Sequence, residues 1–423
     1  MTGLAIVLLL AVLGMPLFAV IAAIALLGFH AAGYDLIAVA VEYYRLGDKP
    51  GLIAIPMFTF AGYLLGESKT PTRLVRLSLA LLGWLPGGLA IVAIVACAFF
   101  TAFTGASGMT IVAIGAFLYP ALVKASYPER YSLGLVTSSG SLGLLFAPSL
   151  PLILYGFVAG QLNTTPTVTI RDLFLAGLMP GALMILVLSL HAMWVGRQLP
   201  KAESAFDWGE VWAALKEAKW ELPLPLIVLG GIYSGEFAAS EAAAVTTLYV
   251  FIVTVLIKKE ISFSKLPDIM GESMRLVGAI LIILGAAGAL SNWMVDQEIP
   301  NHLFDFSRQH VHSAGAFLML LNAVLLMVGM FIDIFSAIVI LTPLLVPVAA
   351  AYGIHPVHFG IVMLANLQIG YFMPPAGMDL FIAAYRFKSN ILTLARACVP
   401  FFLLVGFALL VITWVPWLSL ALL

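Results

Sequence analysis

Two short clusters of small and polar residues interrupt otherwise apolar stretches of this sequence. One is Thr104-Gly105-Ala106-Ser107-Gly108, and the other is Asp333-Ile334-Phe335-Ser336. Hydroxyl, carboxylate and backbone carbonyl oxygens can hold a desolvated hard cation, and glycine lets a ligand approach the backbone closely. Free backbone amides at the start of a helix favour an anion. The two clusters are therefore candidate binding sites for small ions.

A second polar cluster follows each of the first two. Ser138-Ser139-Gly140-Ser141 follows the first, whereas Asn366 and Gly370 follow the second, and each cluster precedes a proline, Pro148 or Pro374. Because proline cannot donate a helical hydrogen bond, we expect a helix to break at each place and to free its backbone groups. Broken helices of this kind are typical of binding sites in membrane carriers.

The two regions form an internal repeat, residues 104–151 and 333–375. Each copy contains a polar tip, an apolar helix predicted to end at a proline, a short connector with a second proline, and then the predicted broken helix. The helix-ending prolines are Pro120 and Pro347, and the connector prolines are Pro128 and Pro356. An odd number of membrane spans between the copies would make the repeat inverted, the usual architecture of alternating-access carriers.

The elements that position these clusters must lie in a membrane. Of the 423 residues, 62% are hydrophobic and only 10% are charged, which exceeds what one soluble core can bury. The formal net charge of -1 comes without a long basic run, so no nucleic acid is expected as a partner. We predict an all-α polytopic membrane protein with inverted repeats, each with a re-entrant helical hairpin and a broken helix.

Hydrophobic length divides the chain into spans and hairpins. Stretches 4–28, 174–195, 277–290 and 398–418 are predicted to be single spans, while 87–123 and 314–348 are too long and are predicted to turn at the polar tips. Residues 222–257 are predicted to form a hairpin that breaks at Ser234-Gly235-Glu236, and residues 74–85, 208–220 and 264–275 to form interfacial helices.

Charged connectors predict the orientation. The connectors 197–221 and 258–275, which contain four Lys or Arg residues each, are expected in the cytoplasm, and the connector 292–312, with one Arg, is expected outside. The first apolar stretch lacks a basic leader region and an A-x-A site, which predicts a retained span. Cys97 and Cys398 lie in apolar runs and indicate no redox or zinc chemistry.

Several polar residues have structural alternatives. Asp333 could be an ion ligand or a helix N-cap, and Asp379 could be a ligand or cap the helix that follows Pro374-Pro375. His355 and His358 are assigned to a connector, which leaves no histidine in the apolar interior of either repeat. An intramembrane hydrolase that uses Ser107 or Ser139 would therefore lack a base, and G-x-S-x-G is absent. Two re-entrant hairpins and helices interrupted by proline also suit an occluded carrier site better than the continuous pore of a passive channel.

The second repeat carries a specific resemblance. GMFIDIFSAIVILTPLLVP and HPVHFGIVMLANLQIGYFMPPAGMDLF, together with GIYSGEFAASEAAAV, resemble the large membrane (M) subunit of tripartite ATP-independent periplasmic (TRAP) transporters, within the ion-transporter superfamily. The similarity extends over essentially the whole chain. A Pro-Pro pair common in the first block of the family is Ala147-Pro148 here.

This resemblance implies sodium-coupled uptake of a small organic anion, such as a carboxylate, sugar acid or sulfonate, and no enzyme activity. It implies a bacterial inner-membrane location, sodium as coupling ion without other cofactors, and two partners: a small four-helix membrane subunit, expected as a separate chain, and a periplasmic substrate-binding protein. A stand-alone sodium/dicarboxylate symporter is the alternative within the same class.

The resemblance also implies an elevator mechanism, with sodium at the hairpin tips and the anion between them. Predicted sodium-binding residues are Thr104, Gly105, Ser107, Ser138, Ser139, Gly140, Asp333, Ser336, Asn366 and Gly370. Predicted substrate-binding residues are Ser107, Gly108, Ser141, Asn366, Pro375 and Gly377. The predicted divisions are scaffold helices with an interfacial arm (1–85), transport-domain repeat 1 (86–160), scaffold helices with arms (161–275), a span and outward connector (276–312), transport-domain repeat 2 (313–390) and a C-terminal span (391–423).

Overall fold

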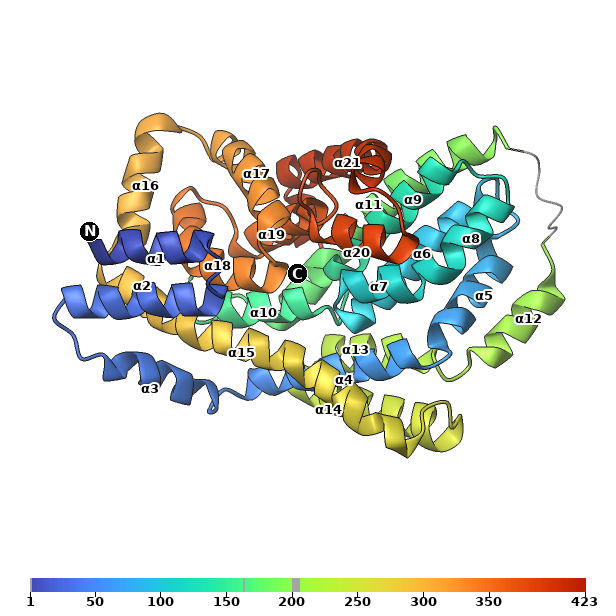
Figure 1. Cartoon of the computed structure of the whole chain (residues 1–423), viewed down its shortest axis with the longest axis horizontal. Coiled ribbons are helices and arrows are strands. Elements are labelled where there is room, and N and C mark those ends of the chain that lie inside the picture. The colour runs from blue at the N-terminus through green and yellow to red at the C-terminus, as the bar shows by residue number, and fades with distance from the viewer. Residues whose placement is uncertain (1, 163, 200–205) are drawn as a thin grey trace.

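The computed structural model describes residues 2–162, 164–199 and 206–423, and every regular element in these ranges is a helix. Within these ranges, six helices are long and apolar enough to cross a membrane, or up to nine if each bent pair of helices counts as one span. The predicted all-α polytopic membrane fold is therefore confirmed. Figure 1 shows α15 as a long helix below the repeats, alongside α2, α3 and α4.

The N-terminal region is more broken than its hydropathy predicts. Its helices are α1 (Thr2–Val12), α2 (Leu17–Ala31), α3 (Ile37–Leu46), η1 (Pro50–Ile53), α4 (Ala54–Glu67) and α5 (Thr70–Leu82). The prediction of one span over 4–28 is wrong, because the chain turns between α1 and α2. Gly14 adopts a φ of +98° there and Pro16 cannot donate a backbone hydrogen bond. The segment is thus a pair of packed helices.

The first repeat forms the predicted hairpin and broken helix. Its elements are α6 (Gly88–Thr104), α7 (Ser107–Ala113), α8 (Gly115–Lys124), α9 (Glu129–Ser139), η2 (Leu142–Leu145) and α10 (Leu150–Ala159). The hairpin turns at Gly105, whose φ is +65°, and α9 ends at the predicted serine cluster. The prediction that a helix ends at Pro120 is wrong: α8 continues for one more turn, since a membrane helix tolerates a proline when neighbouring groups compensate.

The middle of the chain links the repeats. It contains α11 (Ile170–Gly196), α12 (Trp208–Glu217), α13 (Pro223–Tyr233), α14 (Ala239–Phe251), η3 (Ile252–Ile257), η4 (Phe263–Lys265), α15 (Leu266–Asp296) and α16 (Ile299–His310). The hairpin predicted over 222–257 is confirmed as α13 and α14. A separate interfacial helix over 264–275 is not found, because these residues belong largely to α15, which continues into the apolar span without a break. Part of the connector 197–221 lies outside the described residues.

The second repeat contains α17 (Ala314–Phe331), α18 (Ile334–Ala351), α19 (Pro356–Gly370) and α20 (Met378–Phe387), followed by α21 (Ile391–Trp414) and α22 (Trp417–Leu420). Its hairpin turns at 332–333, as predicted. The helix does not end at Pro347, which lies inside α18. The break follows Gly370, so Asn366 lies in the last turn of α19 rather than in the break itself.

Two hydrogen bonds show that the broken helices run in opposite directions. At the start of α9, Arg130 donates to the carbonyl of Arg396, near the start of α21. Toward the end of α10, the Tyr155 hydroxyl donates to the carbonyl of Pro356, where α19 begins. Because α20 ends directly before α21, the path α9–α10 is antiparallel to α19–α20. The repeats are therefore inverted.

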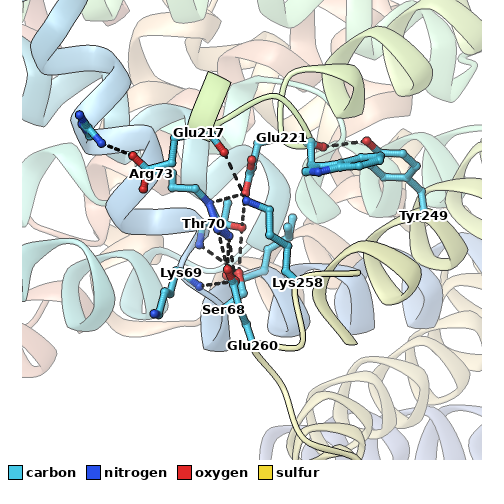
Figure 2. A network of polar contacts seen from close by, with 12 residues as sticks. Ser68, Lys69, Thr70, Arg73, Glu217, Glu221, Tyr249, Lys258 and Glu260 are labelled. Carbon is cyan, nitrogen blue, oxygen red and sulfur yellow. Dashed lines mark hydrogen bonds and ion pairs between the residues drawn. The ribbon is translucent and has the colours of Figure 1, made fainter. Parts of the chain in front are cut away.

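A buried ion-pair network connects α5, the helix that precedes the first hairpin, to two later segments of the chain. Arg73 on α5 donates to Glu221 at 2.7 Å and to Glu260 at 2.7 Å, and the side chains of Arg73 and Glu221 are only 4% and 3% exposed. Lys258 reaches the carbonyl of Glu217 on the far side of the cluster (Figure 2). Arg73 thus joins α5 to the start of α13 and to the segment after η3.

Replacing Arg73 by methionine should destabilise the protein strongly. Removing one partner of a buried pair leaves an uncompensated charge and costs about 3–5 kcal/mol. Burial raises the pKa of Glu221 above its ordinary value of 4.5, and Arg73 opposes that rise. The folded state therefore binds this proton more tightly than the unfolded chain, and stability falls as pH rises through the folded pKa. The loss of unfolding free energy in Arg73→Met should therefore be largest above the folded pKa of Glu221, where this carboxylate is charged, and should become smaller toward pH 4.5.

Thermal unfolding in detergent across a pH series measures this deficit. Arg76→Met is the matched control, since Arg76 pairs with Glu210 and Glu217 on the exposed side of the same helix and such pairs contribute about 0–1 kcal/mol. Equal losses in the two variants would show that the buried network does not fix the arm.

Candidate functional site

Both hairpin tips meet at the second break. The Ser107 hydroxyl, at the first tip, donates to Asp379 Oδ1 at 2.7 Å. The backbone amide of Asp379 donates to the carbonyl of Tyr371. The amide of Ile334, at the second tip, donates to the Tyr371 hydroxyl at 2.6 Å. Three hydrogen bonds therefore connect the two tips, which lie more than 200 residues apart in the sequence.

The first break is held by the first hairpin. The hydroxyl of Thr101 on α6 lies 2.7 Å from the carbonyl oxygen of Gly140 and 2.6 Å from the hydroxyl of Thr110 on α7. The hydroxyls of Ser139, Ser141 and Ser149 are buried and have no partner among the described residues. This break thus combines a fixed carbonyl with hydroxyl oxygens that are free to bind a ligand.

The second break also has side-chain oxygens without a described partner, two of them from amides. Asn366 donates through Nδ2 to Asn322 Oδ1 on α17 at 2.7 Å, and Asn322 donates to Thr413 on α21 at 3.0 Å. The side-chain oxygens of Asn366, Gln368 and Ser336 are buried without a partner in the described part of the chain. The amide oxygen of Asn366 is therefore oriented by its own Nδ2 contacts and left free.

Buried polar oxygens are almost always hydrogen-bonded, so a concentration of unpartnered ones requires an explanation. In the described part of the chain, such atoms also occur elsewhere, but several lie at or beside the two helix breaks of the inverted repeat, within a membrane fold where water is scarce: those of Ser139, Ser141, Ser149, Ser336, Asn366, Gln368 and Asp379. Neutral oxygens that accept no hydrogen bond can instead coordinate a small cation. In the described residues, no group of three or more His, Cys, Asp or Glu could hold a transition metal.

The predicted ligands differ in availability. The hydroxyls of Thr104 and Ser138 donate to carbonyls in their own helices, those of Phe100 and Gly134. Ser107 donates to Asp379, whereas Ser139, Ser141, Ser336 and Asn366 keep free oxygens.

Most of the predicted glycines lie where neighbouring atoms leave no room for a side chain. Gly105 forms the first turn, and Gly108 leaves room for Ile382 on α20. A Cβ at Gly370 or Gly377 would lie within 3 Å of backbone atoms, and Pro375 is exposed. The ligand roles of these residues stay predictions.

The two predicted acids have distinct positions. Asp333 is the N-cap of α18, and its Oδ2 accepts from the amide of Ser336 at 2.9 Å, so the cap alternative is confirmed. Asp379 does not cap α20, which has Gly377 at its N-cap; its side chain reaches across to the first hairpin instead. The sequence offered a signal for the missed residues Thr101, Thr110 and Asn322, because each is polar inside an apolar helix.

The predicted position of one of the two histidines, His358, is wrong. His355 caps α19 as a connector residue would, but His358 lies inside α19 and is 2% exposed. The expectation that no histidine enters either repeat is therefore wrong, because the helix begins at Pro356, earlier than its apolar run suggests. Neither candidate serine bonds to it: Ser107 contacts Asp379, and the Ser139 hydroxyl has no partner among the described residues.

Comparison with known proteins agrees with this architecture. The family described as tripartite ATP-independent periplasmic transporter, DctM component, matches residues 3–418. A C4-dicarboxylate TRAP transporter large permease protein of Rhodobacter capsulatus is 34% identical over 393 residues, covering 91% of this chain and 89% of that protein. An isethionate TRAP transporter permease protein of Oleidesulfovibrio alaskensis is 33% identical over 96% of this chain, which spans 63% of that longer protein.

A solved structure shows the same fold. The crystal structure of the Alcanivorax borkumensis YdaH transporter superposes with a TM-score of 0.60 at 16% identity, covering 90% of this chain and 87% of that one. The inverted hairpins, the broken helices and the match over nearly the whole length lead to one conclusion: this chain belongs to the tripartite ATP-independent periplasmic transporter family, as its DctM component, the large membrane permease.

Proposed function

We propose that this permease carries a small organic anion into the cell and couples its uptake to sodium. The observation that carries the proposal is the concentration of unpartnered buried oxygens at both breaks of the inverted repeat. Such oxygens can replace the hydration shell of a sodium ion, and broken helices near the membrane midplane are where carriers bind their substrate and coupling ions. The predicted ligands with free oxygens are Ser139, Ser141, Ser336 and Asn366.

The names of the relatives support the substrate class. They include permeases for C4-dicarboxylates, isethionate and 2,3-diketo-L-gulonate. All three are small organic acids. We therefore propose a carboxylate, sugar acid or sulfonate as the substrate.

The proposed mechanism is an elevator. Both hairpins and both broken helices would move together as a transport domain against a scaffold that includes α2, α4, α14 and α15, which pack against one another. The substrate would arrive on a periplasmic binding protein, and a small membrane subunit would extend the scaffold in the bacterial inner membrane. The longer relative that is named DctMQ supports a second membrane subunit.

Uptake into proteoliposomes tests this function. The vesicles would contain this chain with its membrane partner subunit, the binding protein outside and a panel of labelled organic anions, with an inward sodium gradient or choline in its place. We expect uptake of one anion class under the sodium gradient alone. Uptake that persists without the binding protein would favour the stand-alone symporter, and a well-folded preparation with no uptake would contradict the proposal.

Ser139→Ala should weaken sodium dependence in the same assay. The variant removes a free hydroxyl at the first break and breaks no hydrogen bond to any residue that the structure describes. We expect the sodium concentration for half-maximal uptake to rise about tenfold, equivalent to roughly 1.4 kcal/mol of binding free energy. Ser132→Ala is the matched control on the same helix, because the Ser132 hydroxyl donates to the carbonyl of Pro128 far from the break. An unchanged sodium dependence in Ser139→Ala would exclude this hydroxyl as a ligand.

A further inference from the structure

Asp379 is a fully buried carboxylate with no counter-charge among the residues that the structure describes. Its side chain is 0% exposed. Oδ1 accepts from Ser107, and Oδ2 has no partner in the described part of the chain. Asp379 takes part in none of the ion pairs among the described residues. Isolating a charged carboxylate in a membrane interior is costly, so this group requires a proton or a bound cation.

The described residues that pack around Asp379 offer no cation to balance its charge. Helix α7 lies along α20 (Figure 1), with Gly108 against Ile382. Arg386, two turns beyond Asp379 on α20, donates to the carbonyl of Val112 at 3.2 Å and so is directed to the far end of α7. Tyr371 and Cys398 are titratable groups in neighbouring segments that interact electrostatically with Asp379, and neither of them supplies a positive charge.

The two breaks differ in charge. Aligned at their first residues, α10 has Pro151 where α20 has Asp379. The free side-chain oxygens of the first break are all serine hydroxyls, whereas the second break also contains this carboxylate. An inverted repeat that kept the two sites equivalent would have an acid in both or in neither.

We propose that Asp379 supplies the charged ligand of a monovalent-cation site where the first hairpin tip meets the second break, and that a cation bound there holds this tip against α20. The inference rests on the proposed function, which makes sodium the cation. A bare carboxylate at this place repels an organic anion, and in a low dielectric such repulsion is strong. The bound cation removes the repulsion, so it binds before the substrate.

Sodium titration of the purified protein tests the site without a substrate. Thermal unfolding is followed at constant ionic strength as sodium chloride replaces choline chloride. Asp379→Asn keeps an oxygen that can accept from Ser107 but removes the charge. We expect sodium to stabilise the wild type saturably, and the half-saturating concentration to rise at least about tenfold in Asp379→Asn. Asp172→Asn is the matched control, a capping carboxylate at the exposed start of α11, and should leave the titration unchanged.

Hydrogen exchange of the wild type gives a second test that needs no variant to fold. Sodium should slow amide exchange in residues 105–113 and 371–380 relative to choline. A wild type that responds to sodium elsewhere but not in these segments would overturn the inference, as would an Asp379→Asn titration equal to that of the wild type. A wild type that shows neither sodium stabilisation nor sodium-driven uptake would instead contradict the proposed function as a whole.

Discussion

Replacing Asn366 by leucine is expected to abolish sodium-driven uptake and to lower the melting temperature. Asn366 joins two roles in one side chain: Nδ2 donates to Asn322, and Oδ1, about one turn before the second break, has no partner among the described residues. Leucine removes the proposed ligand and leaves the 4% exposed Asn322 without its donor. An unsatisfied buried polar group costs about 1–3 kcal/mol.

Uptake in proteoliposomes and thermal unfolding in detergent separate the two roles. Thr413→Val is the control, because it removes the hydroxyl at the far end of the same hydrogen-bond chain and leaves Asn366 intact. We expect Thr413→Val to lower the melting temperature while uptake continues. If both variants lose uptake in proportion to their loss of stability, Asn366 has only a structural role.

Replacing Gly370 by valine should prevent the second hairpin from packing against its broken helix. A Cβ at Gly370 would lie 2.6 Å from the carbonyl carbon of Gly329, and a Cβ at Gly329 would lie 2.9 Å from backbone atoms of Leu367. Two backbones therefore approach at a point where no side chain fits. Overpacking a core typically costs about 1–3 kcal/mol, and here neither backbone can move aside without displacing a hairpin.

Melting temperature and monodispersity after purification measure this effect. Gly406→Ala on α21 is the matched control: a Cβ there meets nothing within 4 Å, and alanine in a helix is favoured over glycine by roughly 0.5–1 kcal/mol. We expect the control to be neutral or stabilising. A Gly370→Val protein as stable as the control would show that the close contact between α17 and α19 is dispensable.

The sequence by itself determined the class of protein and the positions of the hairpin tips and of the first helix break in the repeat. Composition alone requires a membrane, because the total apolar surface of the chain depends on its residues and not on its fold, and here it is more than one soluble core can bury. The tips at Gly105 and Asp333 and the break after Ser139 could be predicted because glycine, proline and capping residues act on their own turn of backbone. The same local rules failed at Pro120 and Pro347, where surrounding helices keep a proline within a continuous helix.

Only the tertiary structure decided which polar groups meet. Ser107 and Asp379 are 272 residues apart, and no local pattern relates them. Thr101, Thr110 and Asn322 looked like isolated polar residues in apolar helices until packing placed them against a break. From the sequence, Asp333 and Asp379 could each be a ligand or a helix cap, and only Asp333 was predicted as a sodium ligand, but Asp333 is occupied as an N-cap and Asp379 is buried with an oxygen that has no partner among the described residues. The availability of an oxygen depends on its neighbours in space, and these are set by how the two inverted halves pack together.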